Sequence, residues 1–207
     1  MQHKEHTSHA ADRSTISKEK QWQQTRLEFV DHIVDGIGTR MDKGIIDTAV
    51  ALNVLDIHTL ASCEGHMDHG TFAPWIDIGT DFELIDSVRQ LKDQAMDIYQ
   101  QGDEELATLM FQNAERMRLT VKTAQTEGLK KLMSALEEFY DDREVPLDQR
   151  LVLLIASDGF ARLESQGVAF QELAPDEEKA ERLIRCQSEM RAFTNFLKEN
   201  FFLKNNP

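Results

Sequence analysis

The 207-residue sequence predicts an α+β fold, in which helices cover a small, largely antiparallel sheet of about four strands. Two observations predict it. Segments with alternating apolar residues come in two pairs, and each pair is joined by a short connection, as in β-hairpins. Segments with apolar residues at helical spacing lie before, between and after these pairs. Single strands do not alternate with single helices, so a doubly wound parallel sheet is not expected.

Two helices are expected before the first strand pair. Apolar residues follow one stripe over residues 18–34 and another over residues 44–55. Asp42 stands just ahead of the second stripe and is a candidate N-cap, because its carboxylate can accept a hydrogen bond from the first helical turn. The polar residues 1–15 are expected to be a flexible tail, and residues 16–207 a single α+β domain.

Four strands are expected in two hairpins. Residues 57–63 and 74–78 alternate apolar and polar side chains, and the proline at the start of the second segment suits the start or edge of a strand. Residues 150–157 contain a run of leucine, valine and isoleucine that is typical of a buried strand. Residues 160–165 can pair back on that strand through the turn at residues 158–159, which reads Asp-Gly.

Two long helices are expected between the hairpins, and one more after them. Stripes over residues 82–99 and 104–140, with a short turn between them, predict a helical-hairpin elaboration of the domain at residues 82–140. A last helix is expected over residues 176–202. One functional hypothesis follows from the long helices: they mediate homo-oligomerisation, and the chain is an interaction module.

Composition narrows the classes of partner. Asp and Glu total 37 against 23 Lys and Arg, a formal net charge of -14, which does not favour a nucleic-acid partner because phosphates attract basic surface. No apolar run of 18 residues occurs, so no membrane segment is expected. The polar N-terminus indicates no secretory signal, and two cysteines, Cys63 and Cys186, make no disulfide framework. We therefore expect an acidic cytoplasmic protein with reduced thiols.

The residues that carry chemistry concentrate between positions 58 and 70. The first hypothesis is a small-molecule or nucleotide-like ligand site on the loop Cys63-Glu64-Gly65-His66, whose amides, carboxylate and imidazole suit a polar ligand. An enzyme built on this loop would use Cys63, Glu64 and His66 as catalytic residues, with Glu64 or His66 as the general base. Four residues are expected to contact the ligand: Ser62, Gly65, Trp75 and Asp77.

The second hypothesis is a zinc site. Cys63, His66 and His69 have the spacing C-x2-H-x2-H, and thiolate and imidazole groups suit zinc. Three protein ligands with one open position would fit catalysis. His58 lies five residues before Cys63, so strand alternation points it to the other face. A purely structural turn, with Cys63 packed as a small apolar residue, is the third interpretation. The cofactor is therefore unknown at this point, with zinc as one candidate.

One resemblance concerns the same segment. Residues 41–66, which begin Met41-Asp42-Lys43-Gly44, resemble the N-terminal signature of the wybutosine-tRNA methyltransferase family, where a Lys-Gly…Asp segment and a helix precede a Ser-Ser-Cys-Ser-Gly-Arg motif. They also resemble bacterial proteins that carry a Ser-Cys-Ser-Gly-His motif after a similar helix. The resemblance implies a shared local structure. The matching residues are Ser62, Cys63 and Gly65, whereas Glu64 replaces a serine and His66 replaces the arginine of the first motif.

Overall fold

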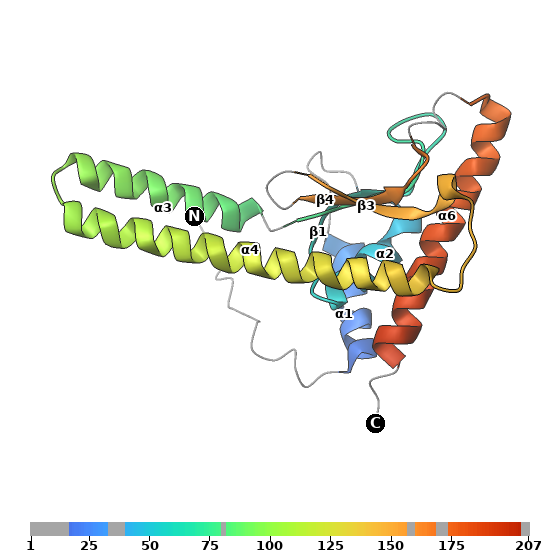
Figure 1. Ribbon diagram of the computed structural model, residues 1–207, viewed down its shortest axis with the longest axis horizontal. Helices are drawn as coiled ribbons and strands as arrows, with labels where there is room; N and C mark the ends of the chain where they lie inside the picture. Colours follow the sequence, from blue (N-terminus) through green and yellow to red (C-terminus); the bar gives the residue numbers. More distant parts are fainter. Residues whose placement is uncertain (1–16, 33–39, 80–81, 157–159, 169–173, 204–207) are drawn as a thin grey trace.

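The computed structural model describes residues 17–32, 40–79, 82–156, 160–168 and 174–203. Helices and a four-stranded antiparallel sheet follow one another in the predicted order, so the α+β prediction is confirmed (Figure 1). Three predictions fall outside the described residues: the tail at 1–15, the end of the first helix at 33–34, and the turn at 158–159. None of the helices in the described ranges has an apolar stretch that would carry it through a bilayer.

The sheet has the strand order β1-β2-β4-β3, and every neighbouring pair is antiparallel. Its central pair therefore joins the first hairpin to the second, because β2 lies beside β4. The alternation of side chains divides the sheet into two faces, and the buried face points toward the helices. The four strands are β1 (Thr59–Cys63), β2 (Trp75–Ile78), β3 (Leu151–Ile155) and β4 (Ala161–Ser165).

Helix α2 (Lys43–Val54) lies against the buried face of the sheet, and α1 (Lys18–His32) and α6 (Asp176–Leu197) pack on α2 (Figure 1). A short π-helix, Lys198–Leu203, continues α6. The central layer is α2, whose residues 49–52 are completely buried between the sheet and the other helices. This burial explains why the sequence of α2 is apolar nearly all round, and it fixes the start of α2 close to the end of β1.

The predicted helical hairpin is present as α3 (Phe82–Gln100) and α4 (Glu104–Tyr140), and most of it projects from the rest of the molecule (Figure 1). Asp103 caps α4, since its side chain accepts a hydrogen bond from the Leu106 amide at 3.0 Å. The far end of α4 has a different role: Leu132 and Phe139 are buried in the main core. The projecting part of the hairpin is therefore shorter than residues 82–140, because residues 129–140 belong to the core.

A buried polar network fixes α6 against the end of α4. The Tyr140 hydroxyl accepts a hydrogen bond from the Leu151 amide at 2.7 Å and donates one to Glu189 at 3.0 Å. Arg143 donates to the other oxygen of the Glu189 carboxylate at 2.6 Å. Glu189 is buried with its charge paired, so this helix cannot shift without exposing or separating that ion pair.

We predict that Leu132→Ala lowers the free energy of unfolding by about 2–5 kcal/mol, because it leaves a cavity under the sheet. Met133→Ala is the control, since the neighbouring Met133 is 45% exposed while Leu132 is fully buried. The control should change stability by about 0.5 kcal/mol or less. Urea unfolding followed by circular dichroism measures both. Equal effects for the two variants would contradict the assignment of residues 129–140 to the core.

Candidate functional site

The residues with chemistry lie where β1 ends and turns toward β2. Cys63 is the last residue of β1 and stands opposite Trp75, the first residue of β2. The chain then turns at Gly65, which has a positive φ of 83°. A Cβ atom at Gly65 would lie 2.8 Å from the Phe72 carbonyl oxygen and 2.9 Å from a methyl group of Leu183 on α6. The glycine is therefore required by both the backbone conformation and the close packing of the loop.

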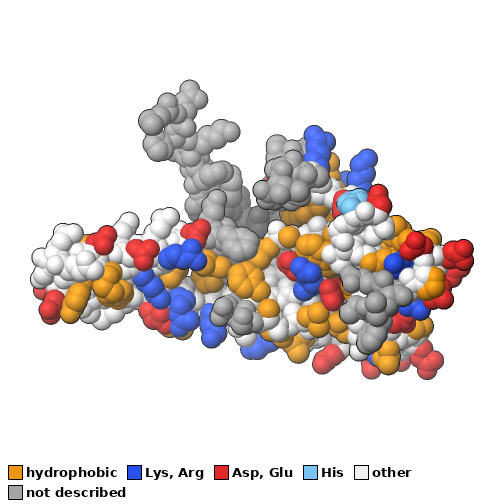
Figure 2. Space-filling view, turned by 90° about the horizontal axis from the view of Figure 1, so that it is seen from above, with side chains coloured by type: hydrophobic (Ala, Val, Ile, Leu, Met, Phe, Trp, Pro, Cys, Tyr) orange, Lys and Arg blue, Asp and Glu red, His pale blue; other side chains and the backbone are white. Residues whose placement is uncertain are grey.

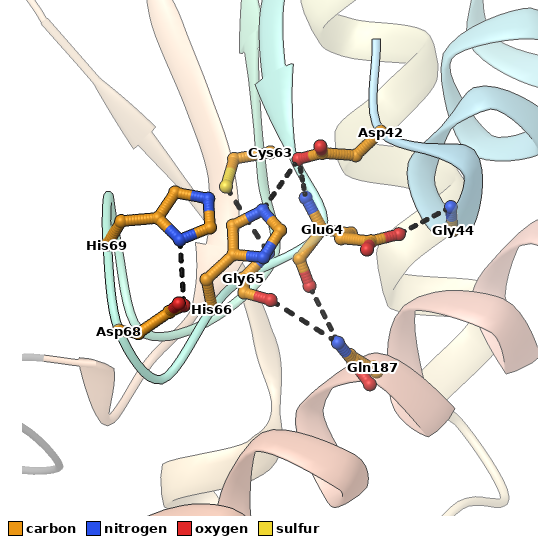
Figure 3. A network of polar contacts seen from close by, with 9 residues as sticks. All are labelled: Asp42, Gly44, Cys63, Glu64, Gly65, His66, Asp68, His69 and Gln187. Atoms are coloured by element: carbon orange, nitrogen blue, oxygen red, sulfur yellow. Dashed lines mark hydrogen bonds and ion pairs between the residues drawn. The ribbon is translucent and has the colours of Figure 1, made fainter.

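Two carboxylates tie this turn to the start of α2 (Figure 3). Asp42 Oδ2 accepts a hydrogen bond from the Glu64 amide at 3.1 Å. In return, Glu64 Oε2 accepts one from the Gly44 amide, in the first turn of α2, at 2.6 Å. We call this reciprocal pair of hydrogen bonds the carboxylate clasp. It satisfies an amide that a helix N-terminus leaves without an intrahelical partner, and it places the Asp42 side chain beside the end of β1.

Three potential metal ligands converge inside the clasp. The side-chain donor atoms of Asp42, Cys63 and His66 all lie within 4.8 Å of one another. His66 Nε2 is 3.0 Å from Asp42 Oδ2, and the side chains of these two residues are 20% and 30% exposed. Cys63 is buried. The group thus combines an oxygen, a sulfur and a nitrogen donor at a place that solvent still reaches.

The electrostatics of the group keep the carboxylate charged and the thiol protonated. Burial acts to raise the pKa of Asp42, but the Glu64 amide and the contacts with His66 outweigh it, so this pKa lies below its ordinary value. Burial raises the pKa of the Cys63 thiol, and the charge of Asp42 raises it further, against a hydrogen bond from the Gly65 amide to the sulfur at 3.3 Å. At neutral pH the thiol therefore keeps its proton, unlike the thiolate of a nucleophilic cysteine.

Helix α6 supports the loop from the other side. Gln187 Nε2 donates to the Glu64 carbonyl oxygen at 3.1 Å and approaches the Gly65 carbonyl oxygen at 3.5 Å. Figure 3 shows Gln187 reaching up from α6 to these carbonyls, on the opposite side of the loop from Asp42. The loop is therefore held from two elements, the start of α2 and the middle of α6.

His69 lies beside the converging group and is not a member of it. Its ring stacks on that of His66 with 4.1 Å between centroids, and its Nδ1 is 2.7 Å from Asp68 Oδ1 (Figure 3). The His69 side chain is 66% exposed. The zinc ligands predicted from the sequence were Cys63, His66 and His69, whereas the structure brings Asp42 together with the first two.

Two of the predicted ligand contacts, Trp75 and Asp77, cluster around Arg162 on the face of the sheet that also carries Cys63, the cross-strand partner of Trp75. Asp77 accepts two hydrogen bonds from the Arg162 guanidinium, at 2.6 and 2.9 Å, and this guanidinium also lies 4.1 Å from the centroid of the Trp75 ring. Asp77 and Arg162 line a hollow of about 440 Å³ on the face of the sheet away from α2. Ser62 points to the buried face, where its hydroxyl has no hydrogen-bond partner among the described residues.

Sequence reasoning missed Asp42 and Gln187 as site residues. Asp42 does precede α2, but its side chain makes no capping hydrogen bond to that helix. The cap is made by Glu64, which the sequence suggested as a catalytic residue. One signal for Asp42 was present, because it stands in the segment 41–66 that carried the family resemblance. Gln187 had no such signal, because it lies more than 120 positions away on a helix of ordinary amphipathic pattern.

We predict that Gly65→Ala destabilises the protein more than Gly102→Ala does. Both glycines have a positive φ, 83° and 93°, so each substitution introduces left-handed strain of about 1–2 kcal/mol. Only at Gly65 does the added Cβ also meet neighbouring atoms, since nothing lies within 4 Å of it at Gly102. The difference should be about 1–3 kcal/mol in urea unfolding. An equal decrease in the free energy of unfolding for the two variants would contradict this prediction, because it would mean that the loop at Gly65 makes room for the Cβ atom at no energetic penalty.

We predict that Cys63 is alkylated only at a pH above that of an ordinary thiol, because burial and the charge of Asp42 raise its pKa. Asp42→Asn removes that charge and should move the midpoint of iodoacetamide labelling to lower pH. Mass spectrometry assigns the label to Cys63 or Cys186. A wild-type midpoint at or below about 8.5, the ordinary thiol value, would contradict the electrostatic description.

Comparisons of this chain with known protein families, with curated proteins and with solved structures gave no match. The local resemblance of residues 41–66 to the wybutosine-tRNA methyltransferase family therefore stays a prediction. What the site can do is argued from its own geometry: three donor atoms of different kinds, from three positions of the chain, held together by the carboxylate clasp.

Proposed function

We propose that Asp42, Cys63 and His66 bind a divalent metal ion of the zinc class, with one coordination position left for water or a small polar ligand. The convergence of their donor atoms within 4.8 Å is the observation that carries the proposal. Zinc accepts oxygen, sulfur and nitrogen donors together, and a site with three protein ligands is typical of zinc that acts on a substrate rather than zinc that only stabilises a fold.

The distance between two of the donors is close to the one that a zinc ion requires. Bonds of about 2.0–2.3 Å around a tetrahedral zinc separate neighbouring ligand atoms by about 3.3–3.8 Å. His66 Nε2 and Asp42 Oδ2 are 3.0 Å apart, so a bound ion needs them to part only slightly. A hydrogen bond holds His66 Nε2 and Asp42 Oδ2 together, and its proton lies between the two atoms that would bind the metal. The Cys63 sulfur likewise carries a proton that the metal would replace.

Metal binding must displace those protons. The thiol of Cys63 has a raised pKa, so its proton leaves only when the positive charge of the ion, supported by the Gly65 amide, stabilises the thiolate. Asp42 needs no such help, because its pKa is lowered and it is charged across the neutral range. The affinity for zinc should therefore rise with pH until Cys63 ionises freely.

A small-molecule or nucleotide-like ligand, predicted on the loop from Cys63 to His66, is compatible with this proposal. Such a ligand would occupy the open position of the metal, and an enzyme would use the metal to polarise a bound water or a carbonyl group. The Glu64 carboxylate is bonded to Gly44, so its part in this scheme is to hold Asp42 in place. The net charge of -14 favours a small ligand over the tRNA that the family resemblance would suggest.

We predict that the purified protein binds one zinc ion per chain in a background where His3, His6 and His9 are replaced by glutamine. Asp42→Asn, Cys63→Ser and His66→Ala should each weaken binding by about 100-fold or more, since the first two replace an anionic donor with a neutral oxygen and the third removes the imidazole. Competition with a chromophoric chelator measures the affinity, and elemental analysis gives the stoichiometry.

Two further variants separate this set of ligands from the one predicted by spacing alone. His69→Ala should leave the affinity within about threefold of the parent, because His69 is exposed and paired with Asp68. His58→Ala is the matched histidine control. Loss of zinc in His69→Ala with retention in Asp42→Asn would overturn the proposed ligand set. A parent protein that takes up no zinc near pH 8 would overturn the function itself.

A further inference from the structure

The projecting part of the hairpin of α3 and α4 buries very few of its apolar side chains. Among the described side chains of residues 84–127, where the two helices face each other beyond the core, the buried ones are one valine and three alanines: Val88, Ala95, Ala107 and Ala114. Six larger side chains of this projecting part are exposed: Leu84, Met96, Tyr99, Leu106, Leu109 and Leu119. A further seven are only partly buried: Ile85, Leu91, Ile98, Met110, Phe111, Met117 and Val121. An apolar surface of this extent is typical of an interface.

Charge is distributed unevenly along this hairpin. Residues 93–105, which include the turn and which we call the acidic end, contain Asp and Glu but no Lys or Arg. Residues 116–131 of α4, which we call the basic segment, contain five Lys and Arg and one Glu. Figure 2 shows red side chains toward the free end of the hairpin and blue ones gathered along its middle. Each hairpin therefore has two regions of opposite charge on one rigid element.

Part of this charge has no ion-pair partner among the residues that the structure describes. Arg118 is paired with Glu115, and Arg89 with Asp86. Arg116 and Lys122, by contrast, make no ion pair among the described residues, and neither do Asp93 and Asp97. Asp93 and Asp97 lie on α3 and Arg116 and Lys122 on α4, so both pairs are measured from the turn at residues 101–103 that joins the two antiparallel helices. With a rise of 1.5 Å per residue, the centres of the two pairs are about 15 Å apart along the hairpin. None of these four side chains pairs with another among the described residues.

A hollow adjoins the basic segment. It has a volume of about 620 Å³ and lies between α3 and α4, with Ile85, Val121 and Leu129 in its wall. Arg89, Arg118 and Lys122 also line it, together with Asp86, which pairs with Arg89. Lys122 is the cation of this rim that makes no ion pair among the described residues. An apolar wall with a net positive rim suits a ligand that presents large apolar side chains surrounded by carboxylates. The acidic end has this combination, because Met96 and Tyr99 are exposed among its carboxylates.

We propose that two copies of this chain associate through their hairpins in antiparallel orientation, with the acidic end of each copy against the basic segment and hollow of the other. A two-fold axis produces this contact twice, because any patch that meets its complement on the partner is met in return. The axis would cross α4 midway between the two regions, near residue 112. This inference does not depend on the metal site.

The occupant is a second copy of the chain because the hairpin itself carries both halves of the contact. A foreign partner would have to supply both an acidic, apolar surface for the basic segment and a basic surface for the acidic end. The pairing also covers the exposed leucines and Tyr99, which would otherwise be a site of nonspecific aggregation.

The test begins with the mass of the full chain in solution, measured by light scattering after gel filtration or by sedimentation equilibrium. The proposal predicts a dimer at low ionic strength that weakens as salt is raised from about 0.05 to 0.5 M, because salt screens exposed charges. A wild-type chain that stays monomeric at every concentration tested would overturn the proposal and leave the hairpin surface to a different protein.

Charge reversal locates the interface. Asp93→Lys with Asp97→Lys should weaken the homodimer by about 10- to 100-fold, and Arg116→Glu with Lys122→Glu should do the same, since each change converts attraction into repulsion on both sides of the axis. An equimolar mixture of the two variants should regain the dimer as a heterodimer, because their reversed charges are complementary. Glu28→Lys with Glu177→Lys changes the net charge as much as the first variant does, at exposed positions outside the hairpin, and should leave the dimer intact.

Circular dichroism confirms that each variant remains folded, and the heterodimer arm makes the test independent of small losses in stability. Homodimers that persist unchanged in both hairpin variants would place the interface elsewhere and overturn the proposal. A mixture that remains monomeric while each variant is folded would overturn the antiparallel pairing of the acidic end with the basic segment.

Discussion

Two carboxylates, Asp42 and Glu64, join segments of the chain that are about twenty residues apart. Asp42 accepts a hydrogen bond from the Glu64 amide, and Glu64 accepts one from the Gly44 amide at the start of α2. Neither α2 nor the end of β1 can therefore move without breaking a hydrogen bond to a charged acceptor. Such bonds are stronger than those between neutral groups, and here they are partly shielded from water. The positions of Cys63 and His66 relative to Asp42 follow from this constraint.

The clasp is placed by the packing of the helices beneath the sheet. Helix α2 is buried on nearly all sides, which sets the position of its first turn, and α6 is fixed near the site by the buried charge of Glu189. Gln187, two residues before Glu189, then holds the carbonyls of the loop from the side opposite Asp42. The site therefore rests on rigid elements, and three donor atoms can stay close together before any metal binds, which lowers the cost of ordering them.

Much of the fold was predictable because local patterns decided it. The long helix was expected over residues 104–140 and is found there, since its apolar stripe and Asp103 at its start agree with each other. The strands were predicted within two residues at each end, because alternation and the turn residues mark them. The pairing of β2 with β4 could not be predicted from the local sequence, because it depends on contacts between two hairpins that are distant in the chain.

The site was predictable only in part. Cys63 and His66 stand close in sequence, so spacing found them, but the third donor comes from the other side of a helix. Asp42 and Glu64 exchanged the roles that local rules suggested: the residue at the N-cap position turned to the site, and the residue in the reactive loop became the cap. A carboxylate at either place satisfies the same local rules, so only the three-dimensional packing decides between them.

X-ray absorption spectroscopy of the zinc-loaded full chain, with His3, His6 and His9 replaced by glutamine, tests the central claim most directly. The proposed site predicts one sulfur neighbour at about 2.3 Å and nitrogen or oxygen neighbours at about 2.0–2.1 Å around the ion. If the Cys63→Ser variant still binds some zinc, the spectrum of that zinc should show no sulfur neighbour. A first shell of nitrogen and oxygen alone in the parent protein would contradict the account, because zinc would then lie somewhere other than between Asp42, Cys63 and His66.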